Sequence, residues 1–269
     1  MRTKTLLLTA ATVVAGFLSA QADTVYSQNV VGYINVSIPA NGFYFLGNQL
    51  TNAGTGNDIQ QVLTNGVVSD PNGQTNTQIF LFNPGANSYT SYTYYNASDA
   101  DNSLGQNEGN GWYLADGTLG VGSVKQGAGT FLKNASPQPI TVTLVGQVPQ
   151  GTNNVLITPG YNTYCIVPPI STNIDCTLLG FPGQSDGNGV TNDVYYLFQP
   201  QSQNYFSAVY YTAADADNAL GGNSGNGFYL ADDTYVSSDP TKWPKVGQAF
   251  FIFHPATSTN VWKVQFNVQ

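Results

Sequence analysis

The segment 99–116, "DADNSLGQNEGNGWYLAD", returns at 215–232 as "DADNALGGNSGNGFYLAD", with 14 of 18 positions identical. Its surroundings repeat as well, in pairs such as "IFLFNP" (79–84) with "YYLFQP" (195–200), and "QGAGTFL" (126–132) with "VGQAFFI" (246–252). Self-similarity over this length predicts two consecutive units of one fold, each about 115–120 residues long.

The apolar runs between these landmarks are typical of β-strands. They are short, rich in aromatic and β-branched residues, and bounded by Asn, Gly, Pro or Ser, as in "GFYFLGN", "SYTSYTYY" and "AFFIFHP". Runs of this kind indicate an all-β sandwich or barrel. We therefore expect two similar β-sandwich or barrel-like domains, each with at most one or two short helical turns. Asp58, before "IQQVL", is a predicted helix N-cap.

The predicted organisation is a signal peptide at 1–22, a first β domain at 23–149 and a second at 150–269. Three similar strands mark its borders: "VVGYINV" (30–36), "TVTLVGQV" (141–148) and "VWKVQFNV" (261–268). Two units with three such strands raise the expectation that the middle strand closes the first unit and also opens the second.

The N-terminal residues predict export. Arg2 and Lys4 precede an apolar run, which ends at Ala20-Gln21-Ala22. This order is typical of a secretory signal peptide, and the run is shorter than the roughly 20 apolar residues that span a bilayer. We expect cleavage after Ala22, an extracellular or cell-surface location, and no transmembrane segment in the mature chain.

The charge balance excludes some partners. Only 8% of the residues are charged, and 7 Lys and Arg stand against 15 Asp and Glu. Nucleic acids and anionic lipids are bound through clustered basic residues, so we expect neither as a partner. The 13% of aromatic residues indicates a folded chain rather than a disordered one.

Cys165 and Cys176 are the only two cysteines. An exported chain passes through a compartment that permits disulfides, so one Cys165–Cys176 disulfide is predicted, with two buried thiols as the alternative. The spacing fits no zinc motif.

The repeated acidic segment has two interpretations. Carboxylates and amide oxygens are the ligands of weak extracellular Ca²⁺ sites. The candidate ligands are Asp99, Asp101, Asn102 and Asp116 in the first copy, and Asp215, Asp217, Asn218 and Asp232 in the second. Alternatively, Asp99 caps a helical turn that Gly105 ends in a left-handed conformation. The structural interpretation is favoured, because the EF-hand spacing is absent.

Few residues favour catalysis. His254 is the only histidine and lies at the end of an apolar run, which is typical of a structural role. Glycoside hydrolysis needs two carboxylates. We rank a secreted glycoside-active enzyme below a carbohydrate-binding module whose stacking rings are Trp112, Phe228 and Trp243; the alternative is that these rings fill cores.

The favoured function is a non-enzymatic structural or adhesive protein of the cell surface. An uncharged, amide-rich surface suits packing against copies of itself or other surface proteins. If the first strand is not held by its own unit, it can add to the last strand of a neighbour and build a filament. The predicted assembly residues are Val30, Val31, Tyr33, Ile34 and Val36 in the first strand, with Val261, Trp262, Val264 and Phe266 in the last.

Three further segments carry a family resemblance: "VYSQNVVGYINV" (25–36), "GQVPQG" (146–151) and "WPKVGQAFFIF" (243–253). They resemble a family of secreted bacterial proteins with two tandem β-rich repeats. The resemblance implies the fold and export. It implies no activity and no functional residues.

Overall fold

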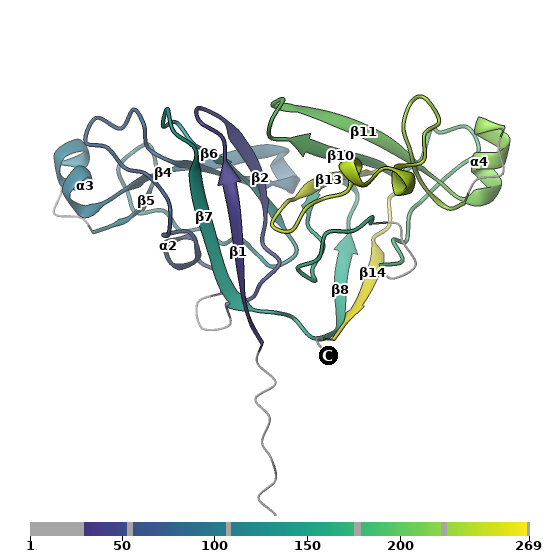
Figure 1. Cartoon of the computed structure of the whole chain (residues 1–269), viewed down its shortest axis with the longest axis horizontal. Coiled ribbons are helices and arrows are strands. Elements are labelled where there is room, and N and C mark those ends of the chain that lie inside the picture. The colour runs from purple at the N-terminus through teal and green to yellow at the C-terminus, as the bar shows by residue number, and fades with distance from the viewer. Residues whose placement is uncertain (1–29, 53–55, 106–108, 175–178, 222–224, 268–269) are drawn as a thin grey trace, which may run out of the picture.

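The computed structural model describes residues 30–52, 56–105, 109–174, 179–221 and 225–267. The chain is mostly β, with a few short helices, and forms two similar halves side by side (Figure 1). Each half contains a two-stranded and a five-stranded antiparallel sheet. The predicted tandem β fold is confirmed, and the sheets are open rather than closed barrels.

The first half begins and ends in its two-stranded sheet. β1 (Val31–Ile38) pairs along its whole length with β7 (Ile140–Gln147). The five-stranded sheet has the order β2-β6-β3-β4-β5. Its strands are β2 (Phe43–Gly47), β3 (Gln78–Asn83), β4 (Ser88–Tyr95), β5 (Gly111–Tyr113) and β6 (Gly129–Lys133).

The second half repeats this arrangement. β8 (Gly151–Ile157) pairs with β14 (Asn260–Phe266), and the five-stranded sheet has the order β12-β11-β10-β13-β9. Its strands are β9 (Gly160–Tyr164), β10 (Val194–Gln199), β11 (Asn204–Tyr211), β12 (Gly227–Tyr229) and β13 (Phe250–His254).

The expectation of a strand shared between the halves is wrong. β7 pairs with β1 and belongs to the first half, whereas β8 opens the second half and pairs with β14. The physical reason is the short "VPQ" connection after β7, which lets the chain leave one ribbon and start another. Each half therefore has its own complete two-stranded ribbon.

The described helices are short. They are α2 (Ile59–Val62), α3 (Ala97–Leu104), α4 (Ala213–Leu220) and the 3₁₀ turns η1 (Pro84–Ala86), η2 (Val236–Ser238) and η3 (Pro240–Lys242). Asp58 caps α2, as predicted, by accepting a hydrogen bond from the Gln60 N–H at 3.0 Å. None of the helices in the described ranges is long and apolar enough to cross a membrane.

Each half has its own core between its ribbon and its five-stranded sheet. In β1, Ile34, Val36 and Ile38 are buried while the residues between them face outward, which is the period-two pattern of a half-buried strand. Trp112 is fully buried in the first core and Trp262 in the second. Burial of each large side chain contributes about 1.5–3 kcal/mol.

A third cluster lies between the halves, on the faces of the five-stranded sheets that point away from these cores. It consists of Phe45, Phe131, Cys165, Phe198, Ala249 and Phe251. The rings stack across the boundary: the Phe45 centroid lies 4.3 Å from Phe131 of its own half and 4.7 Å from Phe251 of the other. Aromatic burial therefore joins the halves into one unit.

Reciprocal hydrogen bonds show that the halves meet with pseudo-twofold symmetry. The repeat and the strand registers make Gly47 equivalent to Cys165, and Gly127 equivalent to Gly247. The Gly47 N–H donates to the Gly247 carbonyl at 2.9 Å, and the Cys165 N–H donates to the Gly127 carbonyl at 2.8 Å. A Cβ on Gly47 would overlap that of Cys165, so close contact here requires glycine.

Candidate functional site

The first conserved aspartate of the repeat, Asp99, stabilises the start of α3. Its N–H donates to Oδ1 of the N-cap Asn96 at 2.9 Å, and its Oδ2 accepts bonds from Asn96 Nδ2 at 2.7 Å and Ser69 Oγ at 2.6 Å. This is a reciprocal capping arrangement. The cap is therefore Asn96 rather than Asp99, because Asp99 occupies the first turn. Gly105 ends α3 with φ 68°, as the structural interpretation predicted.

The second half keeps the same arrangement with a different cap. Thr212 Oγ1 donates to Asp215 Oδ2 at 2.7 Å, and Ser185 Oγ donates to the same oxygen at 2.6 Å. Gly221 ends α4 with φ 71°. Asp99 and Asp215 are therefore constrained in both copies by the same local hydrogen bonds.

The calcium candidates are not gathered around one point. Oδ1 of Asp116 accepts bonds from the N–H and the hydroxyl of Thr118, and the Thr118 side chain is the main cause of the lowered Asp116 pKa. Asp232 makes the same turn with Thr234. Exposed positions on α3 and α4 hold the rest, namely Asp101, Asn102, Asp217 and Asn218. Within the described ranges, no three His, Cys, Asp or Glu side chains could hold a metal ion. The geometry supports the structural interpretation.

Sequence reasoning missed a second repeated loop, "SDPNGQTN" (69–76) and "SDGNGVTN" (185–192), which shares the 116-residue offset. Its aspartate binds several donors of its own loop. Asp186 accepts bonds from the Thr191 hydroxyl at 2.5 Å and from the N–H groups of Thr191 and Asn188. The Thr191 side chain contributes most to lowering the Asp186 pKa to about 2. The repeated offset was the signal that could have found this loop.

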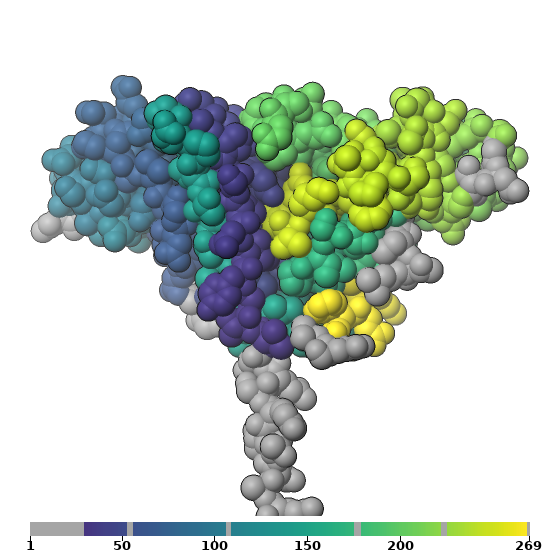
Figure 2. All heavy atoms as spheres, in the orientation of Figure 1, coloured from purple at the N-terminus to yellow at the C-terminus, as the bar shows by residue number. Residues whose placement is uncertain are grey.

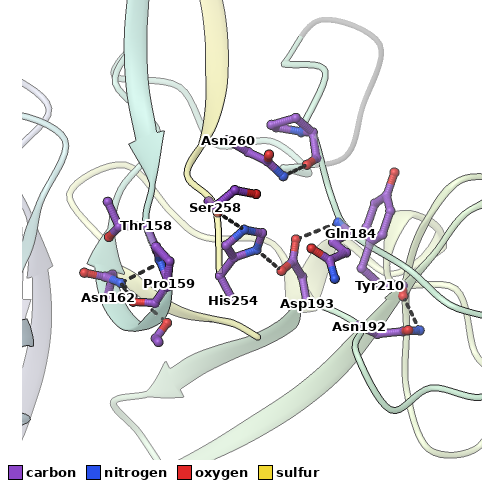
Figure 3. Close-up of polar contacts among 12 residues, drawn as sticks. Thr158, Pro159, Asn162, Gln184, Asn192, Asp193, Tyr210, His254, Ser258 and Asn260 are labelled. Atoms are coloured by element: carbon purple, nitrogen blue, oxygen red, sulfur yellow. Dashed lines mark hydrogen bonds and ion pairs between the residues drawn. The ribbon is translucent and has the colours of Figure 1, made fainter. Parts of the chain in front are cut away.

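His254 is buried in a hydrogen-bonded pair (Figure 3). Its Nδ1 bonds Asp193 Oδ1, and its Nε2 donates to the Ser258 carbonyl at 3.1 Å. Asp193 Oδ2 also accepts a bond from the Gln184 N–H at 2.8 Å. Burial is the main cause of the raised Asp193 pKa. Both side chains have 0% exposure, which separates this pair from any ligand in solvent.

In the first half, uncharged residues make the two outer bonds of this group. Thr77 replaces Asp193 and accepts the Val68 N–H at 2.8 Å, while Asn134 replaces His254 and donates to the Gln138 carbonyl at 2.7 Å. These outer bonds hold equivalent loops in the two halves. A structural role for the histidine pair therefore follows from the repeat itself.

Cys165 is buried and is described as a free thiol. Its predicted disulfide partner, Cys176, lies outside the described residues. Cys165 packs in the aromatic cluster between the halves rather than in the core of the second half. Burial raises the pKa of its thiol, so Cys165 is a poor nucleophile.

The rings predicted to stack on sugars are in the wrong place for that role. Trp112 and Phe228 are fully buried, and Trp243 is half-buried against the second core, with its indole N–H donating to the Val236 carbonyl at 3.1 Å. The alternative interpretation was correct for these residues. They lie on core-facing positions that their strands and loops turn inward.

A different set of rings forms a cleft of about 320 Å³ where the two five-stranded sheets face one another. We call it the aromatic cleft; it is lined by Phe82, Asn87, Tyr89, Tyr161, Tyr196, Tyr205 and Phe251. Tyr89, Tyr161 and Tyr205 are 44%, 42% and 44% exposed. The sequence predicted the strands that carry these rings, but not that their outer faces would meet.

A smaller hollow of about 220 Å³ lies beside it, lined by Phe43, Phe80, Tyr89 and Phe131. Phe43 and Phe80 are the counterparts of Tyr161 and Tyr196, and both pairs have ring centroids 6.0 Å apart. The first half therefore presents bare rings where the second presents phenol hydroxyls. Because of these two hydroxyls, the aromatic cleft is more polar than the smaller hollow.

The cleft tyrosines are neutral hydrogen-bonding groups. Burial is the main cause of the raised pKa of Tyr89, Tyr196 and Tyr205, and the pKa of Tyr196 reaches about 12. The described lining contains no charged side chain. This surface suits a neutral ligand with an apolar face and hydroxyl groups.

The predicted assembly residues divide into two classes. Ile34, Val36, Trp262 and Val264 are buried in the two cores, and Val30 and Phe266 pack against the first core. Val31, Tyr33 and Val261 face outward with exposures of 55%, 70% and 44%, and β1 lies at the surface in the view of Figure 2. The condition stated for strand donation, a first strand that its own half does not hold, is not met, because β1 is fully paired with β7.

Comparison with known proteins found no matching family model, no matching curated protein and no matching solved structure.

Proposed function

We propose that this chain is an exported, non-enzymatic adhesive protein that binds glycans in the aromatic cleft. The observation that carries the proposal is the group of exposed tyrosine rings at the boundary of the halves, Tyr89, Tyr161 and Tyr205. Aromatic rings with polar edges suit sugars, whose ring faces are apolar and whose rims carry hydroxyls. Export, predicted from the first 22 residues, would place the cleft where extracellular glycans occur.

A binding role fits the cleft better than catalysis. The described residues of its lining include no carboxylate, histidine or thiol. Glycoside hydrolysis requires a pair of carboxyl groups about 5–9.5 Å apart on either side of the scissile bond. The buried His254–Asp193 pair cannot supply acid or base to this surface.

The test is glycan binding by the mature protein and by variants of the cleft. We expect array binding to neutral glycans, and Tyr161→Ala and Tyr205→Ala to lower the affinity at least ~10-fold, about 1.4 kcal/mol. The control is Tyr33→Ala, which removes an exposed ring from the outer face of β1. Failure of the mature protein to bind any glycan, or equal losses from the control, would contradict the proposal.

Self-assembly is a second candidate, favoured by the edges of the ribbons. In the described part of the chain, the β1/β7 and β8/β14 sheets contain two strands each and carry exposed Val31, Tyr33, Leu156 and Val261. Exposed strand edges can pair with another chain. Donation of β1 would remove Ile34 and Val36 from the core, so we expect assembly through intact ribbons. Electron microscopy should then show fibres that Tyr33→Lys dissolves.

A further inference from the structure

The edge strands β2 and β9 direct alternate backbone groups towards the opposite half. In β2, the Phe45 carbonyl accepts the Ala249 N–H at 2.9 Å; next to β9, the Cys165 N–H donates to the Gly127 carbonyl. Residues two apart on an antiparallel strand turn their N–H and C=O groups to the same edge. The same edge therefore includes the backbone of Phe43 in β2 and of its counterpart Tyr161 in β9.

In the first half, a glutamine side chain satisfies this edge. The Phe43 N–H donates to Gln203 Oε1 at 2.8 Å, and Gln203 Nε2 donates to the Phe43 carbonyl at 3.0 Å. Gln203 lies in the turn between β10 and β11, with φ 54°. The planar carboxamide of Gln203 thus supplies one acceptor and one donor, which satisfy the N–H and the carbonyl of Phe43.

In the second half, the corresponding turn residue is too short to make this contact. Asn87 replaces Gln203 in the turn between β3 and β4 and has a similar φ of 46°. Its side chain is one methylene shorter. Asn87 and Tyr161 both line the aromatic cleft, and no other described side chain is bonded to the Tyr161 N–H or C=O. The backbone edge at Tyr161 therefore lacks the side-chain cover that Gln203 gives the edge at Phe43.

We propose that the Tyr161 backbone is a sugar subsite that binds two adjacent equatorial hydroxyls of a neutral hexopyranose. One hydroxyl accepts the Tyr161 N–H, and its neighbour donates to the Tyr161 carbonyl, as Gln203 does for Phe43. This inference rests on the proposed function and adds to it the group that is recognised.

The side chains around Tyr161 fit the same ligand. The second half has the Tyr161 and Tyr196 hydroxyls where the first half has the bare rings of Phe43 and Phe80, so the lining of the aromatic cleft carries two additional polar groups. A primary carboxamide, such as a glutamine side chain from a peptide, offers the same donor and acceptor. Exposed rings with hydroxyl edges favour the sugar, because a pyranose uses ring faces and hydroxyls together.

The test compares two tetrasaccharides by titration calorimetry. In cellotetraose, the 2- and 3-hydroxyls of each sugar are adjacent and equatorial; in chitotetraose, an acetamido group replaces each 2-hydroxyl. Chitotetraose keeps an adjacent equatorial pair only at the 3- and 4-hydroxyls of its non-reducing end, so we expect it to bind at least ~4-fold more weakly than cellotetraose to the mature protein.

The key variant is Asn87→Gln. It places at the Tyr161 edge the same residue type that Gln203 provides at the Phe43 edge. It should lower cellotetraose affinity at least ~10-fold without lowering the melting temperature, because its new amide occupies the Tyr161 edge. The matched control, Gln203→Asn, opens the other half and should leave this affinity within about twofold.

Each contrary result has a distinct meaning. Equal binding of the two tetrasaccharides, binding of neither, or unchanged binding by Asn87→Gln overturns the subsite, while the proposed function survives if Tyr205→Ala still abolishes array binding. Binding of a glutamine-containing peptide instead of sugars, lost in Asn87→Gln, identifies a peptide occupant and overturns both proposals. Failure of the mature protein to bind any glycan on the array also overturns both proposals.

Discussion

At the scale of single residues, the duplicated chain separates structural groups from functional ones. His254 and Asp193 are the kind of pair that suggests catalysis, yet Asn134 and Thr77 make the same outer bonds to their loops in the first half. A buried histidine–carboxyl pair whose positions hold uncharged residues in the other half is a matter of packing and hydrogen bonding. By contrast, Asn87 and Gln203 occupy equivalent turns but differ in their contacts. Gln203 hydrogen-bonds the backbone of Phe43, whereas Asn87 is too short to make the equivalent bonds to Tyr161.

The residue pair yields a stability prediction. His254→Asn alone leaves the buried Asp193 carboxylate without its partner and should cost about 3–5 kcal/mol. The double change His254→Asn with Asp193→Thr installs the pair of the first half and should recover most of this loss. Urea unfolding measures both. If the double variant lost as much unfolding free energy as the two single changes together, the interpretation that Thr77 and Asn134 can replace the pair would be contradicted.

A second residue-scale prediction concerns pH. The folded-state pKa of Asp186, about 2, lies below its ordinary value of 3.8. A depressed pKa means that the carboxylate stabilises the fold above about pH 4 and that this stabilisation is lost as the pH falls towards 2. Asp186→Asn should therefore flatten the decline in stability between pH 4 and 2, measured by chemical unfolding. The control is Asp217→Asn on the exposed face of α4; equal flattening by both would contradict the account.

At the scale of elements, the sequence was informative wherever local chemistry decides the outcome. The aromatic runs became strands, Asp58 capped α2, and Gly105 ended α3. The cap of α3 was misplaced by three residues, since Asn96 and Asp99 are both good capping residues and only the loop with Ser69 distinguishes them. The middle strand was misassigned because sequence similarity does not specify a pairing partner.

The capping account of α3 can be separated from calcium binding. Asp99→Ala removes an acceptor for both Asn96 and Ser69 and should cost about 1 kcal/mol. Asp101→Ala, on the exposed side of the helix, should change stability by less than about 0.5 kcal/mol. Thermal unfolding with and without millimolar Ca²⁺ gives both readouts. A calcium-dependent rise in melting temperature that each variant abolishes would contradict the account.

At the scale of the whole molecule, the cleft arises from the way the halves meet. Period-two patterns reveal that a strand has two faces, but in this chain both faces of the five-stranded sheets carry aromatic rings. Trp112 and Tyr161 therefore look alike in the sequence, although one is buried and the other is 42% exposed. Only the pseudo-twofold packing decides which rings face the opposite half, which is why buried rings such as Trp112 and Phe228 were predicted to be exposed.

The most direct test of the central claim is a crystal structure of the mature protein with a bound oligosaccharide from the array. The account predicts a sugar ring in the aromatic cleft, stacked on Tyr161 or Tyr205. Sugar bound only on the ribbon surfaces, or crystals that never take up a glycan at saturating concentration, would contradict it.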